Sequence, residues 1–536
     1  IGDIPGITAR LDYLQWLGID AIWLSPHFPS PQYDCGYDVS DYCDVAPEYG
    51  TLDDFHAMLE EAHRRNIRVI LDLVMNHTSH EHAWFQASRR RAEPYTDWYV
   101  WHDPAPDGGP PNDWQSEFGG PAWTFDDARG QYYYHYFLKE QPDLNWHNPE
   151  VREAMWDVVR FWFDMGVDGF RLDAIGTIFE DAALTDQATG HDWVTLFLKR
   201  TQVRNPQEAE RFHRRFRELI RFQHDLPQVH DIMRELRAVT DEYEGRVLVG
   251  ESEDIAYYGD GTDELHLIFN FALMRTDRLA PDWIAANQVL RLRALPQGSW
   301  PCNTLGNHDT SRSHSAFGDR EHDEALARLS IALMATMRGT PFFYNGEEIG
   351  MADYLLTDRS QLRDTLAIIF DELALARTDQ TPDEVFESTR RLSRDRSRTP
   401  MQWSGGPNGG FSPDGVQPWL PVHPNASQGV NVEAQREDEG SLLHFFRRVL
   451  HLRRDLPALV EGDYALLHAA SEGALVFRRA TAEQALVVAL NFSNVAQPLC
   501  LPHGAARVRF STAGRDGMVD LGALSLAPFE VLITEV

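Results

Sequence analysis

The chain has 536 residues but only four cysteines, at Cys35, Cys43, Cys302 and Cys500. So few thiols in so long a chain exclude a disulfide framework, and none of them has the spacing of a metal-ligand set. The sequence also lacks any apolar run of roughly 18 residues, which a membrane-spanning helix needs. We therefore expect no membrane partner.

Positive charge is scarce as well. Asp and Glu number 82 against 49 Lys and Arg, which gives a formal net charge of −33. Such a surface repels phosphate backbones, so we expect no nucleic-acid partner and favour a neutral substrate. With 43% hydrophobic and 11% aromatic residues, the composition is that of a folded globular protein rather than a disordered one.

Short β-branched runs alternate with segments of helical periodicity, which predicts βα units around a parallel sheet. The runs lie at residues 21–27, 68–76, 169–175, 246–252, 266–271, 302–309 and 341–348. Helical patterns occupy residues 51–66, 148–166 and 322–339. Polar residues gather at the ends of the runs, as they do at the carboxyl face of a (β/α)8 TIM barrel, where such barrels carry their active sites. We expect an α/β protein of that class.

Two regions interrupt or follow this alternation. Residues 77–145 are rich in aromatic residues, Gly and Pro, and are too long for a simple βα loop, so they predict an inserted subdomain. Residues 455–536 change to short strands separated by turns, which predicts an antiparallel C-terminal β-sandwich. The barrel would then comprise residues 1–76 and 146–454.

Three acidic residues end three different predicted strands: Asp173, Glu251 and Asp309. A single acid at a strand end is commonly a helix cap or a member of an ion pair. Three acids converging on one face, with Asp72, His77, Arg171 and His308 beside them, are difficult to explain as buried structural groups. We therefore treat them as candidates for acid and base chemistry.

Several motifs give these residues a context. DLVMNH (72–77), GFRLD (169–173), GE (250–251) and NHD (307–309) resemble, in order and separation, the signature regions of glycoside hydrolase family 13, the α-amylase family. The resemblance spans nearly the whole chain. Four further segments are similar to its α-glucosidase and oligo-1,6-glucosidase branch: DCGYDVSDY (34–42), QPDLNW (141–146), GTPFFYNGEEIGM (339–351) and SRDRSRTPMQW (393–403).

The resemblance implies the roles of the three acids. Asp173 would be the nucleophile that forms a β-glucosyl ester, Glu251 the general acid and then base, and Asp309 the acid that grips the sugar hydroxyls. Arg171 lies two residues before Asp173, so strand alternation places both side chains on one side, where its charge would keep that carboxylate ionised. Glu251 would instead need an apolar or acid-rich environment to hold a proton near neutral pH.

The resemblance also implies a set of sugar-binding residues. Tyr37 would stack on the sugar face and Asp34 would accept hydrogen bonds from its far hydroxyls, which closes the pocket and makes the enzyme exo-acting. His77 and His308 would donate hydrogen bonds to the terminal glucose. Arg394 is the expected partner of Asp34, and Arg398 is expected to brace the same loop.

The residue after the nucleophile bears on linkage. Relatives that act on α-1,6 bonds tend to have Val there and those that prefer α-1,4 bonds Ala or Thr, so Ala174 favours maltose-like substrates. The expected enzyme is a retaining α-glucosidase with some capacity for transglucosylation. Two alternatives remain: a dedicated transglucosylase or trehalose synthase-like glucosyl mutase, and a non-catalytic relative that serves an amino-acid transporter.

Relatives begin with one more strand and a cation loop of the type DxNGDGIGD, so the insertion at 77–145 would follow the third barrel strand. Residues 1–3 match the end of that loop, and this chain would lack the first strand. Asp3 is thus a candidate remnant of a structural Ca²⁺ or Mg²⁺ site, which would require the rest of the loop. We expect no cofactor for the chemistry, an oligosaccharide or α-glucoside as partner, a monomer or small homo-oligomer, and a bacterial cytoplasmic location.

Overall fold

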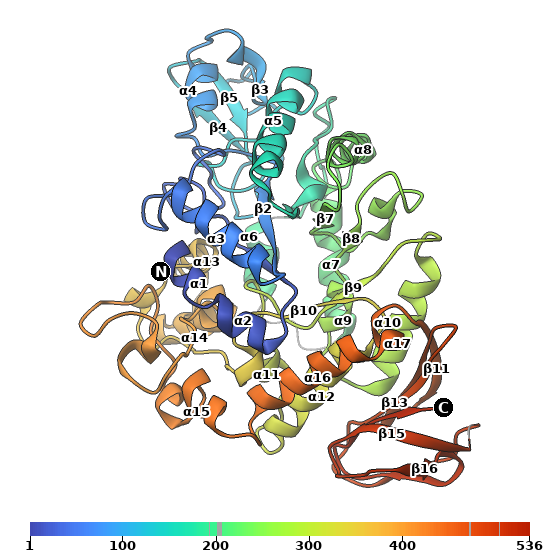
Figure 1. The fold of residues 1–536 in the computed structure, drawn as a ribbon. Helices are drawn as coiled ribbons and strands as arrows, with labels where there is room; N and C mark the ends of the chain where they lie inside the picture. Colours follow the sequence, from blue (N-terminus) through green and yellow to red (C-terminus); the bar gives the residue numbers. More distant parts are fainter. Residues whose placement is uncertain (192, 201–205, 471–472, 503) are drawn as a thin grey trace.

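The computed structural model describes residues 1–191, 193–200, 206–470, 473–502 and 504–536. At its centre, five parallel strands follow the order β1-β2-β6-β7-β8, and β9 and β10 form a separate parallel pair (Figure 1). The bounds are β1 Ala21–Leu24, β2 Arg68–Val74, β6 Gly169–Asp173, β7 Val247–Gly250, β8 Leu267–Ile268, β9 Cys302–Thr304 and β10 Thr340–Phe342. All seven predicted strands are confirmed, each shorter than its predicted range.

Helices connect these strands on the outside of the sheet. The three predicted helices are confirmed as α3 Leu52–Arg64, α5 Pro149–Met165 and α12 Asp323–Thr336. Their ends follow from local chemistry, since Thr51 forms a capping box with Asp54 and Asn148 accepts a hydrogen bond from the N–H of Glu150. Further helices of the barrel include α1 Ile4–Thr8, α2 Leu11–Leu17, α9 Phe271–Met274, α10 Pro281–Ala294, α11 Ser313–Phe317, α15 Val432–Glu437 and α16 Leu442–Asp455.

The predicted insertion contains helix α4 Ala83–Arg89 and a small antiparallel sheet in the order β3-β5-β4. Its strands are β3 Trp101–His102, β4 Trp123–Asp126 and β5 Gln131–Tyr134. Aromatic side chains fill its core, with Trp114, Trp123 and Tyr134 nearly fully buried. This unit stands at one end of the molecule in Figure 1, beyond the carboxyl end of β2.

Two longer excursions leave the sheet after β6 and after β10. The first contains α6 Trp193–Arg200, α7 Pro206–Ile220 and α8 Val229–Thr240, and the second contains α13 Thr365–Arg377 and α14 Pro382–Leu392. Helices α6, α7, α13 and α14 share an apolar cluster that includes Trp193, Leu219, Phe370 and Val385. We call these four helices the helical cap. Because both excursions start at carboxyl strand ends, the cap lies on the face where a parallel barrel carries its site.

The C-terminal part is antiparallel, as predicted. Six strands follow the order β11-β12-β13-β18-β15-β16, and β14 pairs with β17. The strands are β11 Asp463–Ala469, β12 Ala474–Ala480, β13 Ala485–Asn491, β14 Gln497–Leu499, β15 Ala505–Ser511, β16 Met518–Asp520, β17 Leu524–Leu526 and β18 Val531–Glu535, preceded by α17 Pro457–Val460. Buried Arg479 on β12 donates to the carbonyls of Thr336 and Gly462, and so ties this sheet to the C-terminus of α12.

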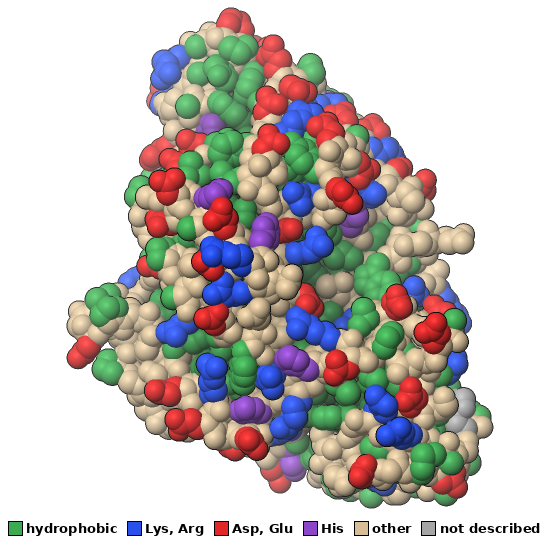
Figure 2. All heavy atoms as spheres, in the orientation of Figure 1, with side chains coloured by type: hydrophobic (Ala, Val, Ile, Leu, Met, Phe, Trp, Pro, Cys, Tyr) green, Lys and Arg blue, Asp and Glu red, His purple; other side chains and the backbone are tan. Residues whose placement is uncertain are grey.

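Figure 2 shows both acidic and basic side chains over the visible face, with several basic side chains near its middle. None of the helices in the described part of the chain combines the length and apolar character that a membrane crossing requires. The four cysteines are all free thiols.

Gly169 permits the close approach of β6 and β7. A Cβ atom at this position would lie 2.3 Å from the carbonyl oxygen of Val247, which is backbone and cannot move aside cheaply. We expect Gly169→Ala to lower the free energy of unfolding by about 1–3 kcal/mol through overpacking. Calorimetry would show this as a lower Tm. Gly504→Ala is the matched control because nothing lies within 4 Å of its added Cβ. Equal Tm changes in both variants would contradict the steric argument.

Candidate active site

One guanidinium group organises the carboxyl end of the central sheet. Arg171 on β6 donates from Nη1 to Asp72 Oδ1 at 2.8 Å and to Asp173 Oδ1 at 2.5 Å. Its Nη2 lies 2.8 Å from Oε2 of Glu251, the residue after β7. The three acids reach one arginine because β2, β6 and β7 are neighbours in parallel register. The structure therefore brings Asp173 and Glu251 together, as predicted.

Aromatic residues enclose the buried side of this cluster. The guanidinium of Arg171 lies 5.0 Å from the ring centroid of Trp23 and 6.0 Å from that of Tyr37. Trp23 Nε1 and Tyr37 OH donate to Asp72 Oδ2 at 3.3 and 3.1 Å. Both rings thus orient Asp72, whose side chain is 0% exposed. Asp72 is a structural anchor for Arg171 and not a group that a ligand can reach.

Burial in this cluster disfavours negative charge. It raises the pKa of the Asp173 carboxyl well above its usual range, and Glu251 and Asp72 add to that effect while Arg171 opposes it. Burial also raises the pKa of Asp72 to about 6, again against the pull of Arg171. Desolvation is the main cause of both shifts, and Arg171 opposes it without cancelling it. The expectation that the charge of Arg171 alone keeps Asp173 ionised is therefore not met.

The turn after β6 contributes a backbone donor. Ala174 has φ 43° and ψ 45°, a left-handed conformation that non-glycine residues rarely adopt. In this conformation its N–H donates to Glu251 Oε2 at 2.9 Å. Glu251 is therefore held by Arg171 and by the backbone directly after Asp173, which fixes the two acids relative to each other.

Asp309 occupies a separate, more positive environment. Arg398 Nη2 lies 2.7 Å and Arg394 Nη1 lies 3.4 Å from Asp309 Oδ1. Burial would raise the pKa of Asp309, but His308, Arg398 and Arg394 outweigh it and hold that pKa well below its usual range. Asp309 is thus ionised at neutral pH. Arg398 also donates from Nε to the His308 carbonyl, as expected for a residue that braces the loop.

The two predicted histidines are both neutral at physiological pH, because burial lowers each pKa to about 3. His308 Nε2 lies 2.9 Å from Tyr37 OH and 3.3 Å from Asp309 Oδ2. His77 is only 1% exposed, and its Nε2 lies 3.1 Å from the Tyr37 carbonyl oxygen and 3.0 Å from Gln141 Nε2. The side chain of His308 is 12% exposed and can meet a ligand, whereas His77 is almost fully buried beside Tyr37 and Gln141.

Asp34 contacts Arg394, which also reaches Asp309. Its Oδ1 is 3.5 Å from Arg394 Nη2, which is the predicted pair, and its Oδ2 accepts from Gln141 Nε2 at 3.2 Å. Arg394 is held more tightly by Asp364, at 2.7 Å from Nη2 to Oδ1. The side chains of Asp34, Glu251 and Asp309 are 10%, 23% and 30% exposed. The site is thus most accessible near Glu251 and Asp309.

Three residues of this site were not predicted from the sequence: Trp23, Gln141 and Asp364. Trp23 lies inside a predicted strand, where tryptophan is a common core residue, so its position gave no functional signal. Gln141 is the first residue of the QPDLNW motif (141–146), but the motif did not indicate a role for it. Asp364 lies in a loop outside every motif, and no pattern in the sequence marks it.

Asp3, the predicted metal remnant, is an N-cap. Its Oδ1 accepts a hydrogen bond from Gly6 N at the start of α1. Calcium takes about 6–8 oxygen ligands, and one exposed carboxylate used as a cap does not fit that requirement. Within the described ranges, no group of three or more His, Cys, Asp or Glu residues is arranged to hold a metal ion.

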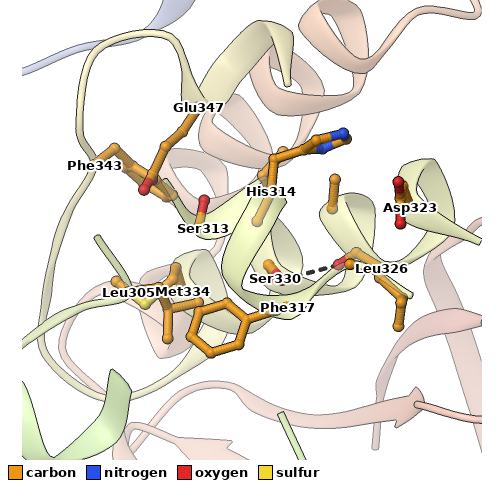
Figure 3. A pocket seen from close by; sticks show the side chains of 13 residues that line it. Leu305, Ser313, His314, Phe317, Asp323, Leu326, Ser330, Met334, Phe343 and Glu347 are labelled. Carbon is orange, nitrogen blue, oxygen red and sulfur yellow. Dashed lines mark hydrogen bonds between the residues drawn. The ribbon is translucent and has the colours of Figure 1, made fainter. Parts of the chain in front are cut away.

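A small cavity in the barrel is lined by none of the site residues described above. Its volume is about 20 Å³, room for about one water molecule, between α11, α12 and Glu347. Figure 3 shows Glu347 and Ser313 close together on one side of this cavity, with Phe317 and Met334 on another. Burial raises the pKa of Glu347 to about 8, so this side chain is neutral at pH 7 and suits an enclosed position.

A parallel α/β barrel that gathers three acids at its carboxyl face defines a barrel glycosidase. The model of the α-amylase catalytic domain matches residues 1–462. The chain belongs to the α-amylase family, glycoside hydrolase family 13, and is an α-glucosidase-like enzyme of that family with its TIM-barrel fold.

Individual relatives support this assignment. A probable alpha-glucosidase of Rhizobium meliloti (strain 1021) is 41% identical over 515 residues, covering 94% of this chain and 87% of that protein. An oligo-1,6-glucosidase of Parageobacillus thermoglucosidasius is 35% identical, covering 100% of this chain and 95% of that protein. The crystal structure of the trehalulose synthase MutB from Pseudomonas mesoacidophila MX-45 has a TM-score of 0.87 at 32% identity, covering 100% of this chain and 95% of that chain.

The opposite pKa shifts of two acids predict opposite effects of pH on stability. The pKa of Asp173 is raised in the folded protein, so its ionisation destabilises the fold as the pH rises above about 4, the unfolded value. The Tm of Asp173→Asn relative to wild type should therefore increase from about pH 4 upward. Scanning calorimetry across pH measures this difference.

Asp309→Asn is the matched control, because its Tm relative to wild type should change with pH in the opposite direction. The pKa of Asp309 is lowered, so its stabilising effect is present above about pH 4 and is lost as the pH falls. The Tm of this variant relative to wild type should fall as the pH rises towards about 4 and stay constant above it. Parallel pH profiles for the two variants would refute the assigned environments.

Proposed function

We propose that this protein is a retaining, exo-acting α-glucosidase that releases glucose from the non-reducing ends of short α-glucosides. The observation that carries the proposal is the bridge from Arg171 to both Asp173 and Glu251, at 2.5 and 2.8 Å. Two carboxyl groups held on one guanidinium lie side by side. That arrangement favours the short separation of about 5–5.5 Å that retaining enzymes use, and not the wider gap of inverting ones.

The reaction then has two steps. In the first, Asp173 attacks the anomeric carbon while Glu251 gives its proton to the departing glycosidic oxygen, which forms a β-glucosyl ester and frees the aglycone. In the second, Glu251 takes a proton from water, and the resulting hydroxide displaces Asp173 to release α-glucose. The backbone N–H of Ala174 and Arg171 keep Glu251 in place for both proton transfers.

The charge of the cluster suits this chemistry. The transition state is oxocarbenium-like and positive, and even with Glu251 protonated the carboxylates of Asp72 and Asp173 outnumber the single positive charge of Arg171. Burial makes that excess unfavourable in the free enzyme, as the raised pKa of Asp173 reflects. The developing positive charge relieves it, so the cluster stabilises the transition state more than the ground state.

The ion pairs and hydrogen bonds around Asp34 support exo action. Asp34 is linked to Arg394 and Gln141, and Arg394 is linked to Asp309 and Asp364. These side chains would meet the hydroxyls of a terminal glucose and leave no path for a second sugar ring. His308 and Tyr37 would contact the same glucose, whereas His77 is almost fully buried beside Tyr37 and Gln141.

The substrate is proposed from the residue after the nucleophile and from relatives. Ala174 favours α-1,4 linkages, as in maltose. A β-branched Val would be strained at its φ of 43°. A dedicated transglucosylase or glucosyl mutase is the second candidate, because the trehalulose synthase MutB shares the fold with a TM-score of 0.87. The same glucosyl ester serves both reactions, which differ in whether water or a sugar intercepts it.

The roles of the two acids are tested by isosteric variants. Asp173→Asn should fold and lose turnover of every α-glucoside, because no ester can form. Glu251→Gln should lose about 10²–10⁴-fold in turnover of maltose, the contribution of a general acid. With 4-nitrophenyl α-glucoside, whose leaving group needs no proton, Glu251→Gln should still form the ester, which mass spectrometry would detect. Normal maltose turnover by either variant would contradict the assignment.

Product analysis separates hydrolysis from transfer. We expect the wild-type protein to convert maltose mainly to glucose, with oligosaccharides appearing only at high substrate concentration. Chromatography of the products over time checks this, with sucrose as a second substrate. Predominant formation of trehalose from maltose, or of a sucrose isomer from sucrose, would instead establish the transferase.

A further inference from the structure

Asp364 holds Arg394 by three short contacts. Arg394 donates to it from the backbone N at 2.8 Å, from Nε at 3.0 Å and from Nη2 at 2.7 Å. The contacts of Arg394 with Asp34 and Asp309 are longer, at 3.5 and 3.4 Å. The orientation of this guanidinium is therefore set by Asp364 and not by the two acids that face the sugar.

Asp364 is itself fixed in place. Its side chain is 1% exposed, and it caps α13 by accepting from Leu366 N at 3.3 Å. Its own N–H donates to Asp395 Oδ2 at 3.1 Å, so the segments at 363–364 and 394–395 hold each other reciprocally. One residue further on, Thr365 Oγ1 donates to the Tyr33 carbonyl oxygen at 2.6 Å, next to Asp34.

This arrangement matters because two arginines face three acids here. Asp364 takes the short ion pair with Arg394, and Arg398 takes the short ion pair with Asp309. Among the described residues, Asp34 has no short ion pair: its side chain lies 3.5 Å from Arg394 Nη2 and accepts one hydrogen bond from the neutral amide of Gln141 at 3.2 Å. A carboxylate without a short ion pair keeps its acceptor capacity for the hydroxyls of a neutral ligand.

We propose that Asp364 is a positioning residue for substrate binding: it draws Arg394 away from Asp34 and so keeps the carboxylate oxygens of Asp34 available to the terminal sugar. The proposal rests on the proposed function. Without the Asp364 carboxylate, Arg394 turns towards Asp34 and forms the close pair that it now lacks. That pair then competes with the sugar hydroxyls.

The position of Asp364 also connects the helical cap to the site. Asp364 begins α13, and α13 packs through Phe370 and Ala374 into the cluster that contains Trp193 and Phe197 of α6. The packing of these two chain excursions therefore sets where the carboxylate stands. Substrate affinity thus depends on cap residues that never touch the sugar.

Asp364→Asn tests this role, since Asn keeps the cap and the shape but removes the charge. We expect the KM for 4-nitrophenyl α-glucoside to rise about tenfold or more, because Asp34 would lose its charge-assisted hydrogen bonds to the sugar. The value of kcat should change much less, because these hydrogen bonds contribute to binding and not to bond cleavage. If the Asn variant does not fold, Asp364→Ser, which also caps a helix, replaces it.

Asp371→Asn is the matched control. Asp371 also lies buried on α13 and pairs with an arginine, Arg359, at 2.7 Å, but it does not contact Arg394. We expect its KM to equal that of wild type even if its Tm falls. A KM that is unchanged in Asp364→Asn, or raised equally in Asp371→Asn, would overturn the proposal.

A double variant tests whether Asp364 acts through Arg394. In the background of Arg394→Gln, adding Asp364→Asn should change KM by less than about twofold, because contacting residues are not additive. A full tenfold increase in that background would refute the proposal. A crystal structure of Asp364→Asn separates this proposal from the proposed function: a wild-type protein without α-glucosidase activity refutes the function, whereas Arg394 unmoved in the variant refutes the positioning.

Discussion

The ion cluster around Arg171 is the interaction on which the rest of the site depends. A buried guanidinium can bind several carboxylates only if neighbouring strands deliver them in register, and β2, β6 and β7 do so. The cluster is poorly compensated, as the raised pKa values of Asp72 and Asp173 show. It persists because the surrounding packing enforces it, which is the usual way in which active sites retain unfavourable electrostatics.

Arginine serves the site in a way that lysine would not. Arg171, Arg394 and Arg398 each use two or more nitrogens to bind separate acceptors, and a planar guanidinium does this with fixed geometry. The sequence contains only two lysines, Lys139 and Lys199, neither of which takes part in the site. In a chain with a net charge of −33, these three cations determine which acids are paired and which remain available.

Much of the fold was predictable because its signals are local. The seven strands and the helices at 52–64, 149–165 and 323–336 followed from periodicity and capping residues. Boundaries were less accurate, since strands such as β8 Leu267–Ile268 end where pairing ends and not where β-branched residues end. Ala174 shows the same limit, because its left-handed conformation depends on the turn between β6 and the next segment and not on its residue type.

The residues of the candidate site were also predictable only in part. Asp173, Glu251 and Asp309 were recognisable because each stands in a motif at a strand end, and the parallel sheet then brought the first two onto Arg171. Asp364 was not recognisable, because it stands outside any motif and meets Arg394 only through the packing of the helical cap.

The sequence alone determined which acids, arginines and histidines are present and at which ends of strands they stand, because residue type and periodicity are properties of the chain itself. Only the tertiary structure decided how charge is shared among them. It determined which acid has a raised pKa, which has a lowered pKa, and which arginine is bound by another acid. Those outcomes depend on distances and burial between segments up to 360 positions apart, such as Asp34 and Arg394, which no local pattern encodes.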